Sequence, residues 1–162
     1  MRWILFLCLL TSPLAAQDRL PAENRAVLDR FVGQWTTEVR IRFLGQSPRE
    51  FAGRGQAHAE WTLEGRFVEF RGSTLPPGES DLQVMTCDVE TGRYRQWLFD
   101  SSGYVHEAWG TWDASSSTLT WRGSDFVIQD RFVTPDRLEW SLVRTAPDGS
   151  VLQRIEGVVT RR

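Results

Sequence analysis

Turn-forming residues recur at short, regular intervals along almost the whole sequence, and this spacing constrains the fold more than any other feature. Nine clusters rich in Gly, Pro, Asp and Ser separate ten segments rich in β-branched and aromatic residues. The clusters lie at residues 45–48, 64–65, 76–78, 88–92, 100–103, 113–117, 122–125, 134–136 and 147–149. None of the segments between them is long enough to hold the helix that would connect two parallel strands. The sequence therefore predicts an all-β, antiparallel domain.

The hydrophobic period changes once, near the N-terminus. Between Pro21 and Gly33 the apolar residues Val27, Leu28, Phe31 and Val32 recur at helical spacing, and Gly33 ends the pattern. From Trp35 to Phe43 apolar residues alternate with polar ones, as in a half-buried strand. A sheet of about ten strands removes its exposed edges most simply by closing. We therefore expect an antiparallel up-and-down barrel of about ten strands with one short N-terminal helix.

The first residues have the pattern of a secretory signal peptide. Arg2 supplies the positive charge, residues 3–10 are apolar, and Ala15 and Ala16 are the small residues before a cleavage site. The apolar run is about half the ~20 residues that a membrane-spanning helix needs. We predict a signal peptide at residues 1–16, a single barrel domain at residues 17–162, no membrane span, and a periplasmic or secreted location.

Cleavage would leave Cys87 as the one cysteine, so no intramolecular disulfide is expected. We interpret Cys87 as a small buried apolar residue. A lipoprotein, with its lipid on Cys8, is the alternative interpretation of the N-terminus.

Charge and residue usage argue against several functional classes. The 19 basic residues are all Arg and are outnumbered by 21 acidic ones, so there is no basic field for nucleic acid and no lysine for catalysis. The two histidines, His58 and His106, lack the spacing of a metal site, and no G-x-S-x-G motif is present. We therefore predict no catalytic residues, no metal and no cofactor.

The motif Gly33-Gln34-Trp35 is similar to the G-x-W entrance of lipocalin-like (calycin) barrels. The segments CDVETGRYRQWLFDSSG, EAWGTWDASSSTLTW and PDGSVLQRIEGVVTRR follow it in order. Together they resemble the secreted bacterial domain-of-unknown-function 1579 family over Leu28 to Arg162. This resemblance implies a barrel without an established activity. It also implies that Gly33 and Trp35 close one end of the barrel, with Trp35 against a late-strand arginine, either Arg154 or Arg161.

Seven of the eight tryptophans remain after cleavage. So many large aromatic side chains in one barrel could line a cavity for a ligand. A ten-stranded barrel encloses more volume than its inward side chains usually fill. We predict that the protein holds a small apolar or amphipathic molecule, with Arg95 or His106 as its polar contact. The predicted ligand-binding residues are Trp61, Trp97, Trp109, Trp140, Arg95 and His106. The alternative is a filled-core structural or interaction module of the cell envelope, without ligand or catalysis.

Overall fold

A computed structural model describes residues 20–75 and 78–162 and shows a closed antiparallel barrel of ten strands with one short helix. The predicted all-β barrel and its N-terminal helix are therefore confirmed. The predicted signal peptide, residues 1–16, lies outside the described residues.

Within the described residues there are one α-helix, ten strands and a single 3-10 turn. Their bounds are α1 Ala22–Asp29, β1 Gly33–Phe43, β2 Arg49–Thr62, the 3-10 turn Leu63–Gly65, β3 Phe67–Leu75, β4 Glu79–Cys87, β5 Tyr94–Asp100, β6 Val105–Asp113, β7 Thr118–Arg122, β8 Phe126–Thr134, β9 Arg137–Thr145 and β10 Val151–Arg161.

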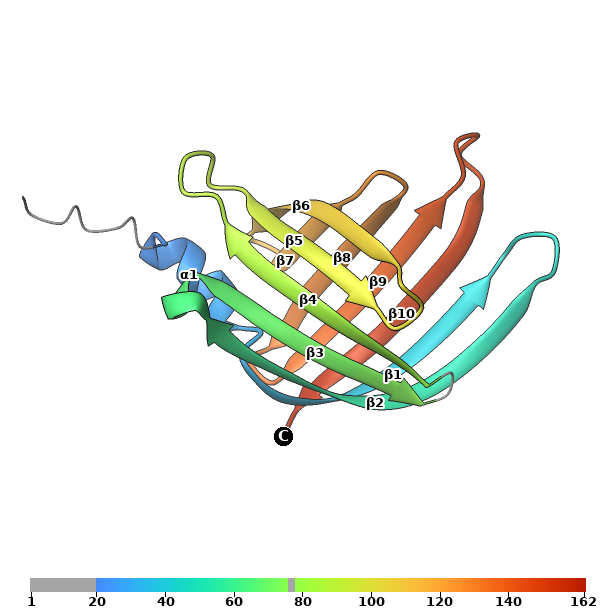
Figure 1. The fold of residues 1–162 in the computed structure, drawn as a ribbon, viewed down its shortest axis with the longest axis horizontal. Helices are drawn as coiled ribbons and strands as arrows, with labels where there is room; N and C mark the ends of the chain where they lie inside the picture. The colour runs from blue at the N-terminus through green and yellow to red at the C-terminus, as the bar shows by residue number, and fades with distance from the viewer. Residues whose placement is uncertain (1–19, 76–77) are drawn as a thin grey trace, which may run out of the picture.

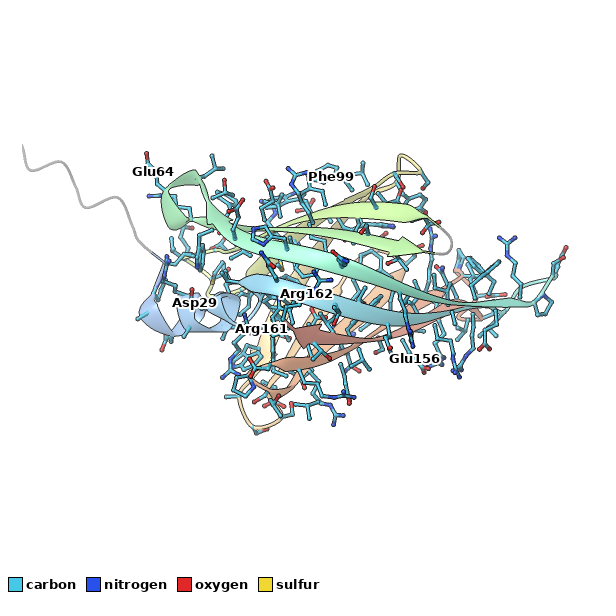
Figure 2. The ribbon with its side chains drawn as sticks, turned by 90° about the horizontal axis from the view of Figure 1, so that it is seen from below. Asp29, Glu64, Phe99, Glu156, Arg161 and Arg162 are labelled. Carbon is cyan, nitrogen blue, oxygen red and sulfur yellow. The ribbon has the colours of Figure 1, made fainter. Side chains whose placement is uncertain are left out.

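Each strand pairs with the next one along the chain, and β1 pairs with β10 to close the barrel (Figure 1). The register of the closing pair places Trp35 opposite Arg161 and Val39 opposite Gly157. Because β1 begins next to α1 and the strands alternate in direction, one end of the barrel carries α1 and the other carries the β1–β2 hairpin (Figure 2). The helix end and the hairpin end therefore differ in structure.

The helix end is filled by an apolar core. The largest fully buried side chains are Trp35, Trp121, Leu28, Met85, Leu119 and Val68. The amphipathic helix contributes Val27 and Leu28 to this core, and Trp35 donates its indole N–H to the carbonyl of Phe31 at 2.7 Å. Burial of each such large apolar side chain stabilises the fold by about 2 to 3 kcal/mol. This end of the barrel is closed.

Arg161 is the arginine that covers Trp35, with its guanidinium carbon 4.1 Å from the centroid of the indole ring. It also donates to the carbonyls of Val32 and Arg30 and forms an ion pair with Asp136 at 3.1 Å. The chain between α1 and β1 is thereby tied to the last strand.

The prediction of Arg154 as the closing arginine is wrong. Arg154 lies seven positions before Arg161, so strand alternation turns it to the opposite face of β10, where it stands opposite Arg42. Gly33 has φ of +136°, and a Cβ atom there would lie 2.3 Å from the Nη1 atom of Arg161. Glycine is required at this position both by the backbone conformation and by the close approach of Arg161.

Candidate functional site

The interior of the barrel beyond the closed end contains a cavity of about 610 Å³. Inward-facing residues of every strand except β7 line it. Its apolar wall consists of Val39, Ile41, Phe70, Leu98, Ile128, Trp140 and Leu142. Two small residues, Ala57 and Ala108, also face it and leave space beside these larger side chains. The cavity is large enough to be a small-molecule site and is mainly apolar.

Asp130 places a carboxyl group in this lining, next to the fully buried Trp121 of the closed core. It is 8% exposed, and its Oδ2 atom accepts a hydrogen bond of 2.8 Å from the fully buried indole N–H of Trp121. Its register partners are Leu119 on β7 and Trp140 on β9. Burial raises the pKa of Asp130 from 3.8 to about 7, against the lowering effect of the Trp121 hydrogen bond.

A line of polar side chains follows β5 and β4 from the middle of the cavity toward the hairpin end. Gln96, which is 3% exposed, donates to Gln83 at 2.7 Å, and Gln83 donates to Asp81 at 2.9 Å. Burial raises the pKa of Asp81, the hydrogen bond from Gln83 lowers it, and the charge of the facing Asp100 raises it again. One side of the cavity is therefore polar and acidic.

Arg144 organises the opposite side of the cavity mouth. Its Nε atom is 2.6 Å from Asp125, and its Nη2 atom donates to the hydroxyl of Tyr104. The ring of His106 lies 4.3 Å from that of Tyr104 and 4.9 Å from that of Phe126. Burial lowers the pKa of His106, with smaller opposing effects of nearby carboxylates. Burial of the ring therefore favours the neutral imidazole.

Of the six predicted ligand-binding residues, the structure places two in the cavity lining, Trp140 and His106. Trp61 also points inward, but it lies at the closed end. There its indole N–H donates to Asp29 at 2.7 Å, and the guanidinium of Arg25 lies 4.1 Å from its ring. Trp61 on β2 therefore contacts α1 and does not line the cavity.

The other three predicted residues, Arg95, Trp97 and Trp109, lie on the outer wall, and their assignment to the cavity is wrong. The guanidinium of Arg95 stacks 4.6 Å from the ring of Trp97 and 5.0 Å from that of Trp109, and it pairs with Glu107 at 2.6 Å.

The inward positions of β5 are the even-numbered ones, which include Gln96. The prediction of Arg95 and Trp97 as ligand-binding residues requires the odd-numbered face of β5, which also carries Phe99, to be the inner one. That face is the outer one, and Phe99 is 39% exposed.

Sequence reasoning missed Asp130, Gln96, Gln83 and Asp81. A signal for Asp130 is present in β8, where Phe126, Ile128 and Phe132 are inward-facing apolar residues at even-numbered positions and Asp130 occupies the remaining position of that series. The glutamines carry no comparable signal, because the face to which they belong is settled only by the closed register.

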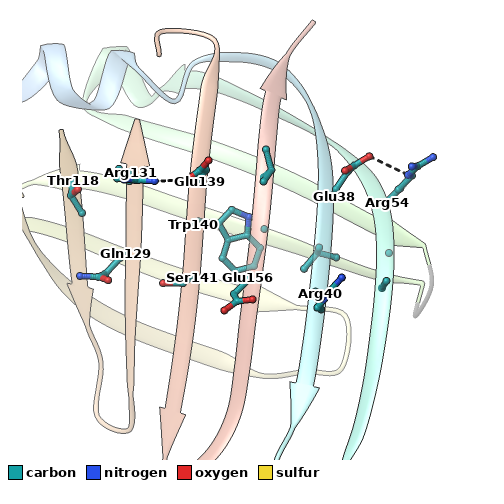
Figure 3. A pocket seen from close by; sticks show the side chains of 15 residues that line it. Glu38, Arg40, Arg54, Thr118, Gln129, Arg131, Glu139, Trp140, Ser141 and Glu156 are labelled. Atoms are coloured by element: carbon teal, nitrogen blue, oxygen red, sulfur yellow. Dashed lines mark hydrogen bonds and ion pairs between the residues drawn. The ribbon is translucent and has the colours of Figure 1, made fainter. Parts of the chain in front are cut away.

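A second hollow, of about 880 Å³, lies on the outer wall over β7 to β10, β1 and β2 (Figure 3). Its surface is charged, and ion pairs join Arg54 to Glu38 and Arg131 to Glu139 (Figure 3). The side chains of Arg54 and Glu38 are 84% and 68% exposed, so their charges are already solvated and paired. The interior cavity, with its apolar wall and buried carboxyl group, is the stronger candidate site.

The model of a family described as "Protein of unknown function (DUF1579)" matches residues 20–161, which include the helix, all ten strands and the lining of the cavity. The chain belongs to the DUF1579 family. The expected family is thereby confirmed over nearly the whole described chain. No curated protein sequence is significantly similar to this member of the family.

The solved structures that are similar to this DUF1579 chain include the following two. Rv2717c from M. tuberculosis superposes with a TM-score of 0.68 at 16% sequence identity, covering 89% of this chain and 99% of that one. The S-type phycobiliprotein lyase CPES from Guillardia theta superposes with a TM-score of 0.59 at 12% identity, covering 85% and 91%. At such low identities the similarity shows a shared barrel fold, and the ligand has to be argued from the cavity.

Among the described residues, no three potential metal-ligand side chains lie close enough together to hold an ion. No helix in the described part of the chain is long and apolar enough to cross a membrane.

Proposed function

We propose that this protein binds a small apolar or amphipathic molecule inside its barrel. The observation that carries the proposal is the cavity of about 610 Å³, which lies between an apolar wall and a polar strip and is closed at the helix end by a packed core. Burying the apolar part of a ligand there would contribute about 25 cal/mol per Å² of surface removed from water. The polar groups on one side would fix the orientation of the ligand.

The filled-core alternative has less support, because the inward side chains leave this volume vacant. Ala57 and Ala108, at the border between the packed core and the cavity, have side chains too small to fill the volume they face. The outer wall is the surface that an interaction module would use.

Titration with the fluorescent neutral probe N-phenyl-1-naphthylamine tests the proposal. We expect saturable binding at micromolar concentration with enhanced probe emission. Ala108→Phe places a ring in the cavity and should weaken binding at least tenfold. Val105→Phe is the matched control, because Val105 is on the same strand, faces outward and is 62% exposed. Absence of saturable binding, or equal weakening by both variants, would contradict the proposal.

Stability provides a second readout of the same pair of variants. In a filled core an added ring costs typically 1 to 3 kcal/mol through overpacking. Ala108→Phe should cost less than this if the cavity accepts the ring. A loss of stability of about 1 kcal/mol or more would support the filled-core alternative.

We further propose that the protein is exported and acts in the periplasm or outside the cell. The support is the charged, apolar and small-residue sequence of residues 1–16. The mass of the exported protein should correspond to a chain beginning within about two residues of Gln17. An intact mass that includes residues 1–16 would contradict the proposal, and a lipid-sized excess on Cys8 would support the lipoprotein alternative.

A further inference from the structure

We propose that the cavity selects a cationic ligand: an amine on an apolar body, whose ammonium group pairs with Asp130 and lies against the indole of Trp140. This inference rests on the proposed function, because it names the class of ligand for the same cavity. It differs from the expectation that Arg95 or His106 is the polar contact of the ligand, because the polar contact is here a carboxyl group.

Asp130 offers one oxygen to a ligand. Its Oδ2 atom is occupied by the N–H of Trp121, and no described residue donates to its Oδ1 atom. Among the described residues, every side-chain oxygen or nitrogen that is fully inaccessible has a hydrogen-bond partner, so Oδ1 is reachable from the cavity. A buried carboxylate with a vacant acceptor site is unfavourable unless a donor approaches it. An ammonium group supplies both the donor and the opposite charge.

Trp140 lies on the strand next to that of Asp130 and faces the same cavity. It is the register partner of Asp130 on the neighbouring strand, and both residues line the cavity, so their Cβ atoms are about 5 Å apart on the same face of the sheet. The electron-rich face of an indole attracts a cation, and the attraction grows when water is excluded. A Cβ atom at Gly157 would lie 2.2 Å from the Nε1 atom of Trp140, so the ring lies across the glycine. A carboxylate and an indole on adjacent strands of the same cavity wall provide the two groups that an ammonium ion needs.

The charge balance of the whole lining favours the same class of ligand. Four carboxyl groups face the cavity or its mouth: Glu79, Asp81, Asp100 and Asp130. The two guanidinium groups in the lining are those of Arg49 and Arg144. Arg144 is already paired with Asp125, so its charge is largely neutralised.

The second guanidinium is also engaged. That of Arg49 lies over the rings of Phe43 and Phe51, at 4.6 and 5.7 Å, near the hairpin. An anionic head group next to Asp130 would be repelled by its carboxylate, and neither of the two guanidinium groups in the described lining is free to compensate for that repulsion. The electrostatics of the lining therefore disfavour a carboxylate and favour an amine.

The shifted titration of Asp130 is consistent with this geometry. Burial raises the pKa of Asp130 to about 7 in the empty cavity, because the charged form lacks a cationic partner there. An ammonium ion within hydrogen-bond distance stabilises that charged form and would lower the same pKa.

The test compares three ten-carbon ligands that differ only in their head group: n-decylamine, n-decanol and n-decanoate. Each displaces N-phenyl-1-naphthylamine from the protein at pH 8 and below its micelle-forming concentration. We expect the amine to displace the probe at a concentration at least tenfold lower than decanoate, with decanol in between. Equal or stronger displacement by decanoate would overturn the inference.

Single-residue variants test whether Asp130 is the source of the preference for the amine. Asp130→Asn keeps an acceptor for the Trp121 N–H and removes the charge. It should therefore weaken the binding of decylamine at least tenfold and change the binding of decanol less than threefold. Glu107→Gln is the matched control, because it removes one negative charge from the outer wall, where Glu107 pairs with Arg95. Unchanged amine binding in Asp130→Asn, or equal effects of both variants, would overturn the assignment.

Trp140→Leu gives an independent reading if Asp130→Asn fails to fold. It should weaken the binding of decylamine more than the binding of decanol. Equal weakening of both would show a merely apolar contact and would overturn the role of the indole. Probe binding itself separates the two proposals. If the neutral probe does not bind the wild type, the proposed function fails. If the probe binds and the amine shows no advantage, the cationic preference alone fails.

Discussion

The replacement of Asp130 by asparagine tests the electrostatics of the cavity floor through protein stability. In the unfolded chain the carboxyl group ionises near pH 3.8, whereas in the folded barrel burial raises its pKa to about 7. Between these pH values the folded state binds more protons at this group than the unfolded state does. The group therefore makes its full contribution to stability below pH 3.8 and loses it progressively as pH rises through 7.

The magnitude follows from the two pKa values. One pKa unit corresponds to about 1.4 kcal/mol, so a rise from 3.8 to about 7 corresponds to a loss of at most about 4 kcal/mol between pH 4 and pH 8. Asparagine cannot ionise, and its side-chain oxygen still accepts the N–H of Trp121. The free energy of unfolding of Asp130→Asn relative to wild type should therefore increase by several kcal/mol between pH 4 and pH 8.

Denaturant unfolding at several pH values between 4 and 8.5, followed by tryptophan emission, measures this difference. Contributions of Asp81 and His106 are common to both proteins and cancel. Asp148→Asn is the control. Hydrogen bonds from Ser150 lower the pKa of the exposed Asp148, so this variant should not gain stability relative to wild type as pH rises. A difference between Asp130→Asn and wild type that stays constant within about 0.5 kcal/mol would refute a buried, poorly solvated carboxyl group.

Three further predictions concern the closed end and the core. Arg161→Ala should lower the free energy of unfolding by about 2 kcal/mol, because the cation–π contact and the hydrogen bonds of Arg161 are lost. Arg154→Ala should change it by less than about 0.5 kcal/mol. Denaturant unfolding of both variants measures the difference, and equal losses would refute the prediction. Burial raises the pKa of the Cys87 thiol to about 11, so Cys87 should be alkylated at pH 8 only after unfolding. Peptide mass analysis locates the modified cysteine, and rapid alkylation of Cys87 in the native protein would contradict the prediction. Gly110→Ala should cost about 1 to 3 kcal/mol, because a Cβ atom there would lie 2.7 Å from the ring of Trp121; a thermal midpoint equal to that of wild type would show that the ring moves freely.

Strand number and barrel closure could be predicted from the sequence because they depend on local signals. Turn clusters and the alternation in β1 are read directly from neighbouring residues, and the G-x-W motif located Trp35 at the closed end. Which arginine covers Trp35 depends on the face of β10. Counting positions from Val159 in the alternating pattern separates Arg161 from Arg154, but only once the register is known.

The site was less predictable because the inner wall is mixed in character. In β5 the inward face carries Gln96 and Asp100, and the outward face carries Trp97 and Phe99, so a comparison of apolar content selects the wrong face. A hydrophobicity pattern assumes that the interior is uniformly apolar, and a binding cavity departs from that assumption at its polar contacts. Asp130 illustrates this, since it occupies an apolar position of the β8 pattern with a polar side chain.

The central claim is that the interior of the barrel holds a small molecule. A structure of the protein crystallised with saturating N-phenyl-1-naphthylamine tests it most directly. The account predicts the naphthalene ring inside the barrel, in contact with Trp140 and the apolar wall between Phe70 and Leu142. A probe seated only in the charged hollow of the outer wall, or an interior filled by rearranged side chains, would contradict it.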